Sequence, residues 1–320
     1  MRRAALPSLL VSSAVTLTLS SAAKADCSTS PCLDAEPAWL SPSALRFALI
    51  SDTNSPKAAQ VGLGATASFR LGPAVLNVPA PNRDGRDVNL LRHATDLSLA
   101  ARLGIGNRLE LTLLLPAGLY QRGAGIKGIT HQSAPEIPTT TLHDPRLGFG
   151  YSLPTASPQF GAKLRFEAKL PLGNTAALSG EQSFVASPAL ALSSRLGGFF
   201  AGAELGARLR RPVDFFGARV GSQGLLAAGA GYALAAARLS FAAELYLLPS
   251  LVRADRIRYL PAEWLASVRY APQALSGVSL GVSGGSGLPL SGNAAGSSFA
   301  LGVPAFRSGL FVRFTPDGER

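Results

Sequence analysis

The sequence predicts an all-β protein: a closed antiparallel transmembrane β-barrel of about 12 strands in up-and-down order. Three observations predict this fold class. The chain is more apolar and less charged than an ordinary soluble domain, it lacks an uninterrupted apolar run that would make a membrane helix, and its apolar and polar residues alternate with a period of two. Apolar residues would then face lipid, and polar residues would face the inside of a cylinder.

Composition defines the class of protein. Of the 320 residues, 47% are hydrophobic and 15% are charged, and the mean hydropathy is +0.23. Soluble domains carry about 25% charged residues, and this hydrophobic content excludes a disordered chain. The net charge is +11, or +8 without Arg2, Arg3 and Lys24. Because the basic residues are scattered among apolar ones, we expect no nucleic-acid binding.

Residues 1–25 are typical of a cleaved signal peptide. Arg2 and Arg3 precede an apolar stretch over residues 6–19, and the small residues Ala23 and Ala25 frame a cleavage site before Asp26. The apolar stretch is short and is diluted by Pro, Ser and Thr, which argues against a retained anchor helix. We therefore expect export from the cytoplasm.

Residues 26–57 form a periplasmic N-terminal segment without a clear strand pattern. Its two cysteines, Cys27 and Cys32, are the only ones in the chain, and in an oxidising compartment we expect them to form a small disulfide loop. Two thiols without nearby histidines do not complete a metal site, so no metal is expected. The segment, which contains Trp39 and several prolines, is long enough to enter the barrel as a plug.

Residues 58–316 carry the barrel pattern. Between residues 162 and 170, Lys163, Arg165 and Glu167 share one face of an extended strand while the apolar residues share the other. The same alternation recurs along the chain in segments of about 10 to 13 residues, the length of a tilted membrane-crossing strand. The predicted strands span residues 58–70, 93–105, 108–120, 144–154, 160–171, 183–195, 199–211, 224–235, 238–249, 263–272, 277–287 and 304–314.

The connections between these strands alternate between short turns and longer segments rich in Pro, Gly and charge. Outer-membrane barrels have short periplasmic turns and longer external loops, and an even strand number places both termini in the periplasm. Lipid offers a free sheet edge no hydrogen-bond partner, so the strands must close into a cylinder. A soluble β-sandwich also alternates, but it favours shorter strands and more Lys and Glu. Aromatic girdles are expected at Phe149, Tyr151, Trp264, Tyr270, Phe306 and Phe314.

The last strand resembles the C-terminal assembly signal of outer-membrane barrels. Residues 307–314 read Arg-Ser-Gly-Leu-Phe-Val-Arg-Phe, and the resemblance implies that Arg307, Gly309, Val312 and Phe314 are read by the barrel-assembly machinery. More widely, residues 58–316 resemble the twelve-stranded barrels of proteobacterial outer-membrane proteins, including the meta-pathway phenol-degradation transporter type and the barrel that precedes OmpA-like domains. Residues 317–320 form a C-terminal tail, and we do not expect peptidoglycan anchoring.

Catalytic chemistry finds little support in the sequence. The three histidines, His93, His131 and His143, lie at strand ends or in external loops, where we expect solvated side chains. His143 precedes Asp144, but Ser152 on the same strand lies about 30 Å away, so the pair cannot form a catalytic dyad. We therefore expect no enzyme activity and no cofactor.

The inward face of the predicted strands carries thirteen basic and seven acidic residues. Two interpretations are possible. The charged residues form a network of cross-strand ion pairs that fills the barrel, or they line a narrow aqueous path whose excess of positive charge favours anions. The principal lumen-lining residues are Arg102, Glu110, Arg146, Lys163, Arg165, Glu167, Lys169, Glu204, Arg208, Arg210, Glu244, Arg269 and Arg313.

These features predict a barrel in the outer membrane, with lipid and the assembly machinery as its partners. The first functional hypothesis is a passive channel or transporter for small solutes, anionic or amphipathic in character, with a net basic lumen. The second is a structural or surface-binding barrel with a filled lumen that acts through its external loops.

Overall fold

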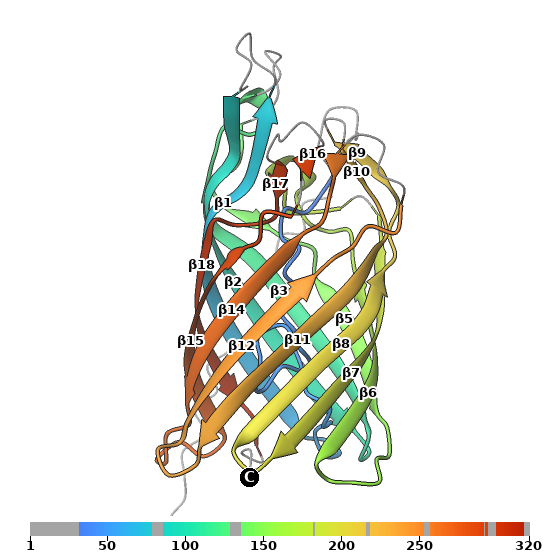
Figure 1. Ribbon diagram of the computed structural model, residues 1–320, viewed down its shortest axis with the longest axis vertical. Helices are drawn as coiled ribbons and strands as arrows, with labels where there is room; N and C mark the ends of the chain where they lie inside the picture. The colour runs from blue at the N-terminus through green and yellow to red at the C-terminus, as the bar shows by residue number, and fades with distance from the viewer. Residues whose placement is uncertain are drawn as a thin grey trace, which may run out of the picture.

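The computed structural model describes residues 32–78, 86–128, 136–181, 183–215, 218–252, 257–290, 292–293 and 299–316. Twelve long antiparallel strands form a closed barrel (Figure 1), which confirms the predicted fold class. These strands are β1 (Val61–Val78), β2 (Arg86–Ile105), β3 (Leu109–Arg122), β5 (Arg146–Ser152), β6 (Phe160–Lys169), β7 (Val185–Leu196), β8 (Phe199–Arg208), β11 (Gln223–Leu234), β12 (Leu239–Leu247), β14 (Ala262–Tyr270), β15 (Val278–Gly287) and β18 (Phe306–Phe314). Each overlaps one of the twelve predicted strands.

Closure of the barrel occurs between β1 and β18. Each long strand pairs with its chain neighbours, and β1 pairs with both β2 and β18, in a register that runs from Leu63 opposite Phe314 to Leu71 opposite Phe306. The cylinder therefore has no free edge, as a hydrocarbon environment requires. No helix in the described part of the chain is both long and apolar enough to cross a membrane.

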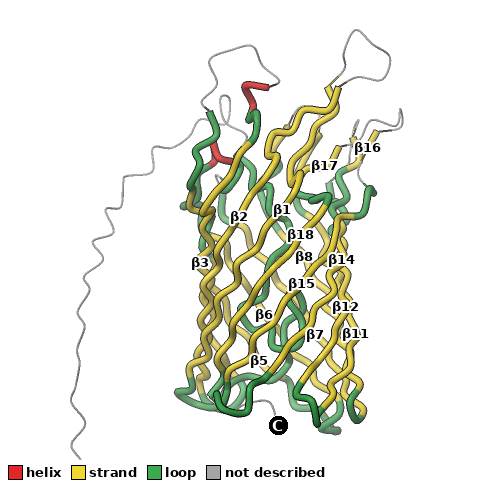
Figure 2. Tube along the Cα trace, turned by 90° about the vertical axis from the view of Figure 1, so that its left-hand side faces the viewer, coloured by secondary structure: helices red, strands yellow, loops and turns green. Residues whose placement is uncertain are grey.

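The two ends of the barrel differ, as the alternating connections predicted. At one end, the turn end, five connections of two to seven residues join consecutive long strands: 106–108, 153–159, 197–198, 235–238 and 271–277. Gly106 and Gly197 have φ of 64° and 60° in the two shortest turns, a conformation that glycine adopts without strain. The opposite end, the loop end, holds the longer connections (Figure 2).

The long connections contain only short elements. These are β4 (Thr141–Leu142), β9 (Val213–Phe215), β10 (Ala218–Val220), β13 (Ile257–Arg258), β16 (Gly292–Asn293), β17 (Phe299–Leu301) and the 3-10 helices η1 (Ile126–Gly128) and η2 (Thr175–Ala177). At the same end β1 and β2 extend beyond their predicted limits as a hairpin (Figure 1). The extension is explained by burial, because Leu76, Val88 and Leu90 pack into an apolar cluster over the loop end.

The outer surface is that of a membrane barrel. Along β3, Leu109 and Leu111 are exposed while Glu110 and Thr112 are buried, and the same alternation runs along β6 and β14. The six predicted girdle aromatics are all exposed on the outside. Apolar residues thus face outward and charged residues face the lumen, the inverse of a soluble β-protein.

Residues 32–57, here called the lumen segment, run inside the barrel from the loop end to the turn end (Figures 1 and 2). Near the loop end, Asp34 forms a β-bridge with Ser179, and at the turn end Ala59 and Gln60 exchange backbone hydrogen bonds with Gly104 just before β1 begins. Cys32 therefore lies at the loop end of the barrel, whereas Phe314, the last residue of β18, lies at the turn end. Asp26, which follows the predicted cleavage site, lies outside the described residues.

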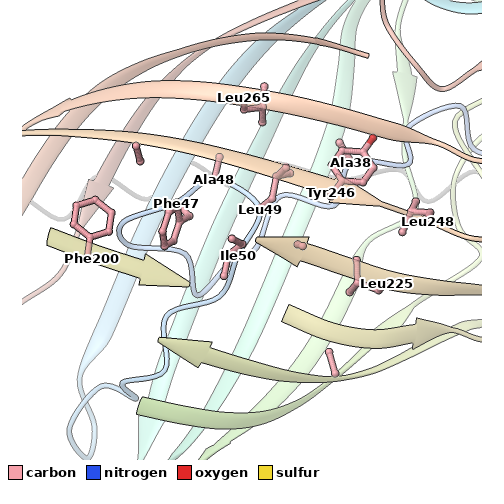
Figure 3. Close-up of a cluster of buried hydrophobic side chains, with 13 residues drawn as sticks. Ala38, Phe47, Ala48, Leu49, Ile50, Phe200, Leu225, Tyr246, Leu248 and Leu265 are labelled. Carbon is pink, nitrogen blue, oxygen red and sulfur yellow. The ribbon is translucent and has the colours of Figure 1, made fainter. Parts of the chain in front are cut away.

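The middle of the lumen segment forms a hydrophobic core with the barrel wall (Figure 3). Phe47 and Ile50 of the segment pack among Phe200, Leu225 and other wall residues. Glycines in the wall make room for the Phe47 ring: a Cβ atom at Gly202 or Gly229 would lie 2.8 or 2.7 Å from it. The interior is therefore packed at this level like the core of a soluble protein.

Candidate functional site

The candidate site is the barrel lumen together with the segment that occupies it. All thirteen residues that the sequence suggested as lumen-lining point into the barrel or lie at its loop-end rim. Eleven of them are buried, and Arg210 and Arg313 are half-buried. Several of them contact the lumen segment directly, among them Lys169, Arg208 and Glu244.

The upper half of the lumen, towards the loop end, is a layer of paired charges. The segment carboxylate of Asp34 contacts the Lys169 ammonium and lies 3.7 Å from Nδ1 of His143. Lys169 also lies 3.7 Å from Asp144 and 3.5 Å from Glu181. Buried charges are tolerated when they are paired in this way.

A second carboxylate of the segment, Glu36, bridges two arginines of the wall. Nη1 of Arg70 lies 2.9 Å from its Oε2, while Arg307 donates from Nη1 and Nη2 to its two oxygens at 3.1 and 2.9 Å. Wall carboxylates bind the other sides of the same guanidinium groups: Asp96 for Arg70 and Glu263 for Arg307. Four strands and the segment thus meet in one network.

His143 departs from the sequence expectation of a solvated loop side chain. It is buried, with Nε2 3.1 Å from Asp96 and Nδ1 facing Asp34. Burial alone would lower the pKa of His143, but the two carboxylates outweigh it and raise the pKa to about 9. A histidine held protonated between two carboxylates cannot serve as a general base. His131 lies outside the described residues, and His93 is half-buried in β2, stacked on Phe69.

Asp144 organises the loop-end connections rather than a catalytic pair. Its two carboxylate oxygens accept hydrogen bonds from the backbone N–H groups of Gly173 and Glu181, at 2.6 and 2.7 Å. Burial raises the pKa of Asp144 to about 6, against the opposing effect of Lys169. The side chain therefore fastens the β6–β7 connection over the rim.

Trp39 of the segment is contacted by two wall arginines. The guanidinium carbons of Arg146 and Arg208 lie 4.8 and 4.4 Å from the centroid of the Trp39 ring, within the range of a cation–π contact. Arg146 also donates to the carbonyl of Leu40, and Arg208 to the carbonyl of Pro37. Basic wall residues are thus satisfied by an aromatic face and by backbone oxygens as well as by carboxylates.

At mid-height the polarity of these contacts reverses, and wall carboxylates bind backbone donors of the segment. Glu244 accepts from the N–H groups of Ala48 and Leu49 at 2.7 and 2.8 Å, and Glu204 accepts from Ser51 at 3.1 Å. Glu204 also pairs with Arg165, which contacts Glu167. These carboxylates hold a turn of the segment against β8 and β12.

The lower half, towards the turn end, has few ion pairs. Lys163 and Ser43 both bind Oε1 of Glu110, at 2.9 and 2.6 Å, and the hydroxyl groups of Thr53 and Ser193 lie 2.6 Å apart. Arg102 is buried, and its Nη1 has no hydrogen-bond partner among the described residues. Arg313 donates to the carbonyl of Phe47, and the Phe311 ring lies near the guanidinium groups of Arg269 and Arg313.

Little open volume remains between the lumen segment and the wall. Three cavities there measure about 40, 20 and 10 Å³, which is room for one to a few water molecules. The two larger cavities share Leu40, Ser98 and Leu114 in their linings. In this conformation none of these three cavities has room for more than a few water molecules.

Sequence reasoning missed how the wall charge is matched. It considered ion pairs between strands, whereas Asp34 and Glu36 of the segment supply two of the carboxylates in the upper half. A usable signal was present: two acidic residues and a Trp in a chain segment that directly precedes a basic barrel. Their partners could not be assigned, because the contacts join residues up to 271 positions apart.

The remaining predicted site residues are placed as follows. Arg307 and Gly309 face inward on β18, and Val312 and Phe314 are exposed on its outer surface; their role in assembly remains a prediction. Cys32 is disulfide-bonded, and Cys27, the other cysteine of the chain, lies outside the described residues. Within the described residues, no group of three or more His, Cys, Asp or Glu side chains is arranged to hold a metal ion.

Comparison with known proteins identifies the fold. No protein family profile and no curated protein matches the sequence. The crystal structure of the COG4313 outer membrane channel from Pseudomonas putida F1 is similar over 82% of this chain and 97% of that chain, with 15% identity and a TM-score of 0.60. The NanC porin covers 79% of this chain and 99% of its own, with 11% identity and a TM-score of 0.51. The chain therefore has the fold of the proteobacterial outer-membrane barrels that its sequence resembles.

Proposed function

We propose that the protein is a passive outer-membrane channel for small solutes, held closed by its lumen segment. The observation that carries this proposal is the composition of the interior: a closed wall lined by charged side chains, occluded by a segment that is not a strand of the barrel. The similarity to the channel from Pseudomonas putida F1 supports it at the level of fold.

Withdrawal of the segment would leave the barrel ladders intact. Each long strand pairs with long strands on both sides, whereas residues 36–52 contact the wall through side chains and single backbone groups. Because the wall does not need the segment to complete its ladders, an occluded and an open state of the same barrel differ chiefly in the position of that segment.

The wall charge favours anions once the segment has withdrawn. Thirteen basic and seven acidic residues were assigned to the lining, and Asp34 and Glu36 would leave with the segment. Small anionic or amphipathic solutes are therefore the proposed cargo, with outer-membrane lipid and the barrel-assembly machinery as the other partners. In this proposal the turn end faces the periplasm. The lumen segment then begins on the external side, which differs from the expectation that both termini are periplasmic.

The test replaces residues 36–52 with a Gly/Ser linker of the same length and measures current across planar lipid bilayers. We expect steady conductance from the linker variant and closed or briefly open channels from the wild type, with reversal potentials in a KCl gradient that indicate anion preference. As a control, a Gly/Ser replacement of residues 153–159, in a turn outside the lumen, should behave as the wild type does. A folded linker variant that carries no current contradicts the proposal.

A second candidate function is favoured by the same filled interior. The largest of the three cavities is about 40 Å³, and the apolar cluster containing Leu33, Leu90 and Tyr259 covers the loop end. A structural or surface-binding barrel that acts through its external loops would need no open path. In the bilayer experiment this candidate predicts no current from either protein.

We propose no enzyme activity, because both nitrogens of His143 face carboxylates.

A further inference from the structure

The Arg70–Arg307 pair lies at the seam where the barrel closes. The two residues are direct register partners on β1 and β18, and both are buried, at 2% and 3% exposure. Like charges directly opposite each other in a sheet repel and destabilise the pairing. An anionic group placed between the two guanidinium groups relieves this repulsion.

Glu36 supplies that anionic group, in the geometry of a bound ligand. Arg307 donates hydrogen bonds to both carboxylate oxygens of Glu36, from Nη1 to Oε2 and from Nη2 to Oε1. Nη1 of Arg70 forms an ion pair with the same Oε2. Such a two-point contact is the preferred way for arginine to recognise a carboxylate. Glu36 does not belong to the wall, because it reaches the seam from the lumen segment.

The rest of the pocket is preorganised without Glu36. Asp96 binds Nε and Nη2 of Arg70, and Glu263 binds Nε and Nη2 of Arg307, so both guanidinium groups keep their orientation when the segment leaves. The hydroxyl of Tyr246 in turn donates to Glu263 at 3.2 Å. A cavity of about 40 Å³ borders Glu36 and Arg307 and gives the carboxylate a free side.

We propose that Arg70 and Arg307 form a carboxylate-binding site in the channel wall, occupied by Glu36 in the closed state and open to the carboxylate of a solute when the segment withdraws. The site itself follows from the contacts above, whereas its use by a solute rests on the proposed channel function. The segment then acts as an internal competitor: solute carboxylate and Glu36 exclude each other from the same two guanidinium groups.

The test is chemical rescue of a Glu36→Ala variant by acetate. The temperature at which the purified barrel loses its folded electrophoretic mobility is measured in sodium acetate, sodium chloride and sodium sulfate at equal ionic strength. We expect this temperature to fall in Glu36→Ala and to rise again with acetate in a saturable way, with a smaller effect of chloride and sulfate. If the variant does not refold in chloride, its refolding yield in acetate becomes the readout.

Two controls separate the site from general salt effects. Asp52→Ala removes another buried acidic residue of the same segment, whose carboxylate accepts from the N–H of Asn54, and acetate should not rescue it. Adding Arg70→Gln to Glu36→Ala should abolish the acetate effect. Equal effects of the three salts on Glu36→Ala, or equal rescue of Asp52→Ala, overturn the site.

The solute step has a separate readout. In planar bilayers, acetate should reduce the chloride current of Glu36→Ala more strongly than that of Glu36→Ala with Arg70→Gln. If acetate rescues Glu36→Ala but reduces the chloride current equally in both variants, the solute step is overturned and the binding site is supported. If the linker variant of residues 36–52 carries no current, the proposed function is overturned, while the rescue experiment still decides the site.

Discussion

The upper and lower halves of the lumen hold the same segment by different means. In the upper half, Asp34 and Glu36 enter a network of buried ion pairs with Lys169, Arg70 and Arg307. In the lower half, the Phe47 ring fits against glycines of the wall, and the segment otherwise contributes hydroxyl and backbone groups, some of them bonded to charged wall side chains such as Glu110 and Arg313. Charge therefore positions the part of the segment in the upper half, and packing is the main contribution in the lower half.

This difference has consequences for stability. A buried ion pair is strong only while both partners are charged, so the upper half should respond to pH. Packing of an aromatic ring depends on shape and should respond to changes of volume. Three substitutions test this difference, by hydrogen exchange or by thermal unfolding and without any measurement of conductance.

The largest effect is expected for Phe47→Ala. Removing a buried aromatic ring costs about 3–5 kcal/mol, which here would weaken docking of the segment in the lower half. The backbone amides of Ala48 and Leu49, which donate to Glu244, should then exchange hydrogen about 100-fold faster or more. Amides within the β11 ladder should be unaffected, and Phe47→Leu should have a smaller effect. Unchanged exchange at Ala48 and Leu49 would show that packing of the Phe47 ring does not position the segment.

A pH effect of intermediate size is expected from His143 in the upper half. The folded-state pKa is raised from 6.5 to about 9, so the stabilisation is fully present below pH 6.5 and is lost as pH rises through about 9. The maximum contribution is about 3 kcal/mol. The difference in unfolding temperature between wild type and His143→Gln should therefore shrink between pH 6 and pH 10. A constant difference over this range would show that the charge of His143 does not hold the segment.

The smallest effect is expected for Thr53→Val in the lower half. The substitution preserves shape and removes the hydroxyl that lies 2.6 Å from that of Ser193, at a cost of about 0.5–1.5 kcal/mol. Exchange of the Ser51 amide should accelerate by about 3- to 10-fold. Ser193→Ala should have a similar effect, and the double variant should be less than additive. Full additivity would show that the two hydroxyls do not interact.

The barrel could be predicted from the amino-acid sequence. Alternation such as that of Lys163, Arg165 and Glu167 is a local property with a period of two. It can therefore be recognised in the sequence before the fold is known. The same periodicity assigned the inward side chains, including Arg102 and Glu110, and the lengths of the connections separated the turn end from the loop end. Only element ends were displaced, most of all in the β1–β2 hairpin.

Tertiary structure alone decided what fills the barrel. Residues 32–57 have no periodic pattern, and their partners lie on strands from β1 to β18, so no local signal identifies them. His143 shows the same limit: its place at a strand end suggested a solvated side chain, yet the segment carboxylate of Asp34 and the wall carboxylate of Asp96 enclose it. Strand periodicity is encoded between neighbours in the chain, whereas the pairing of Glu36 with Arg70 and Arg307 exists only once the barrel has closed around the segment.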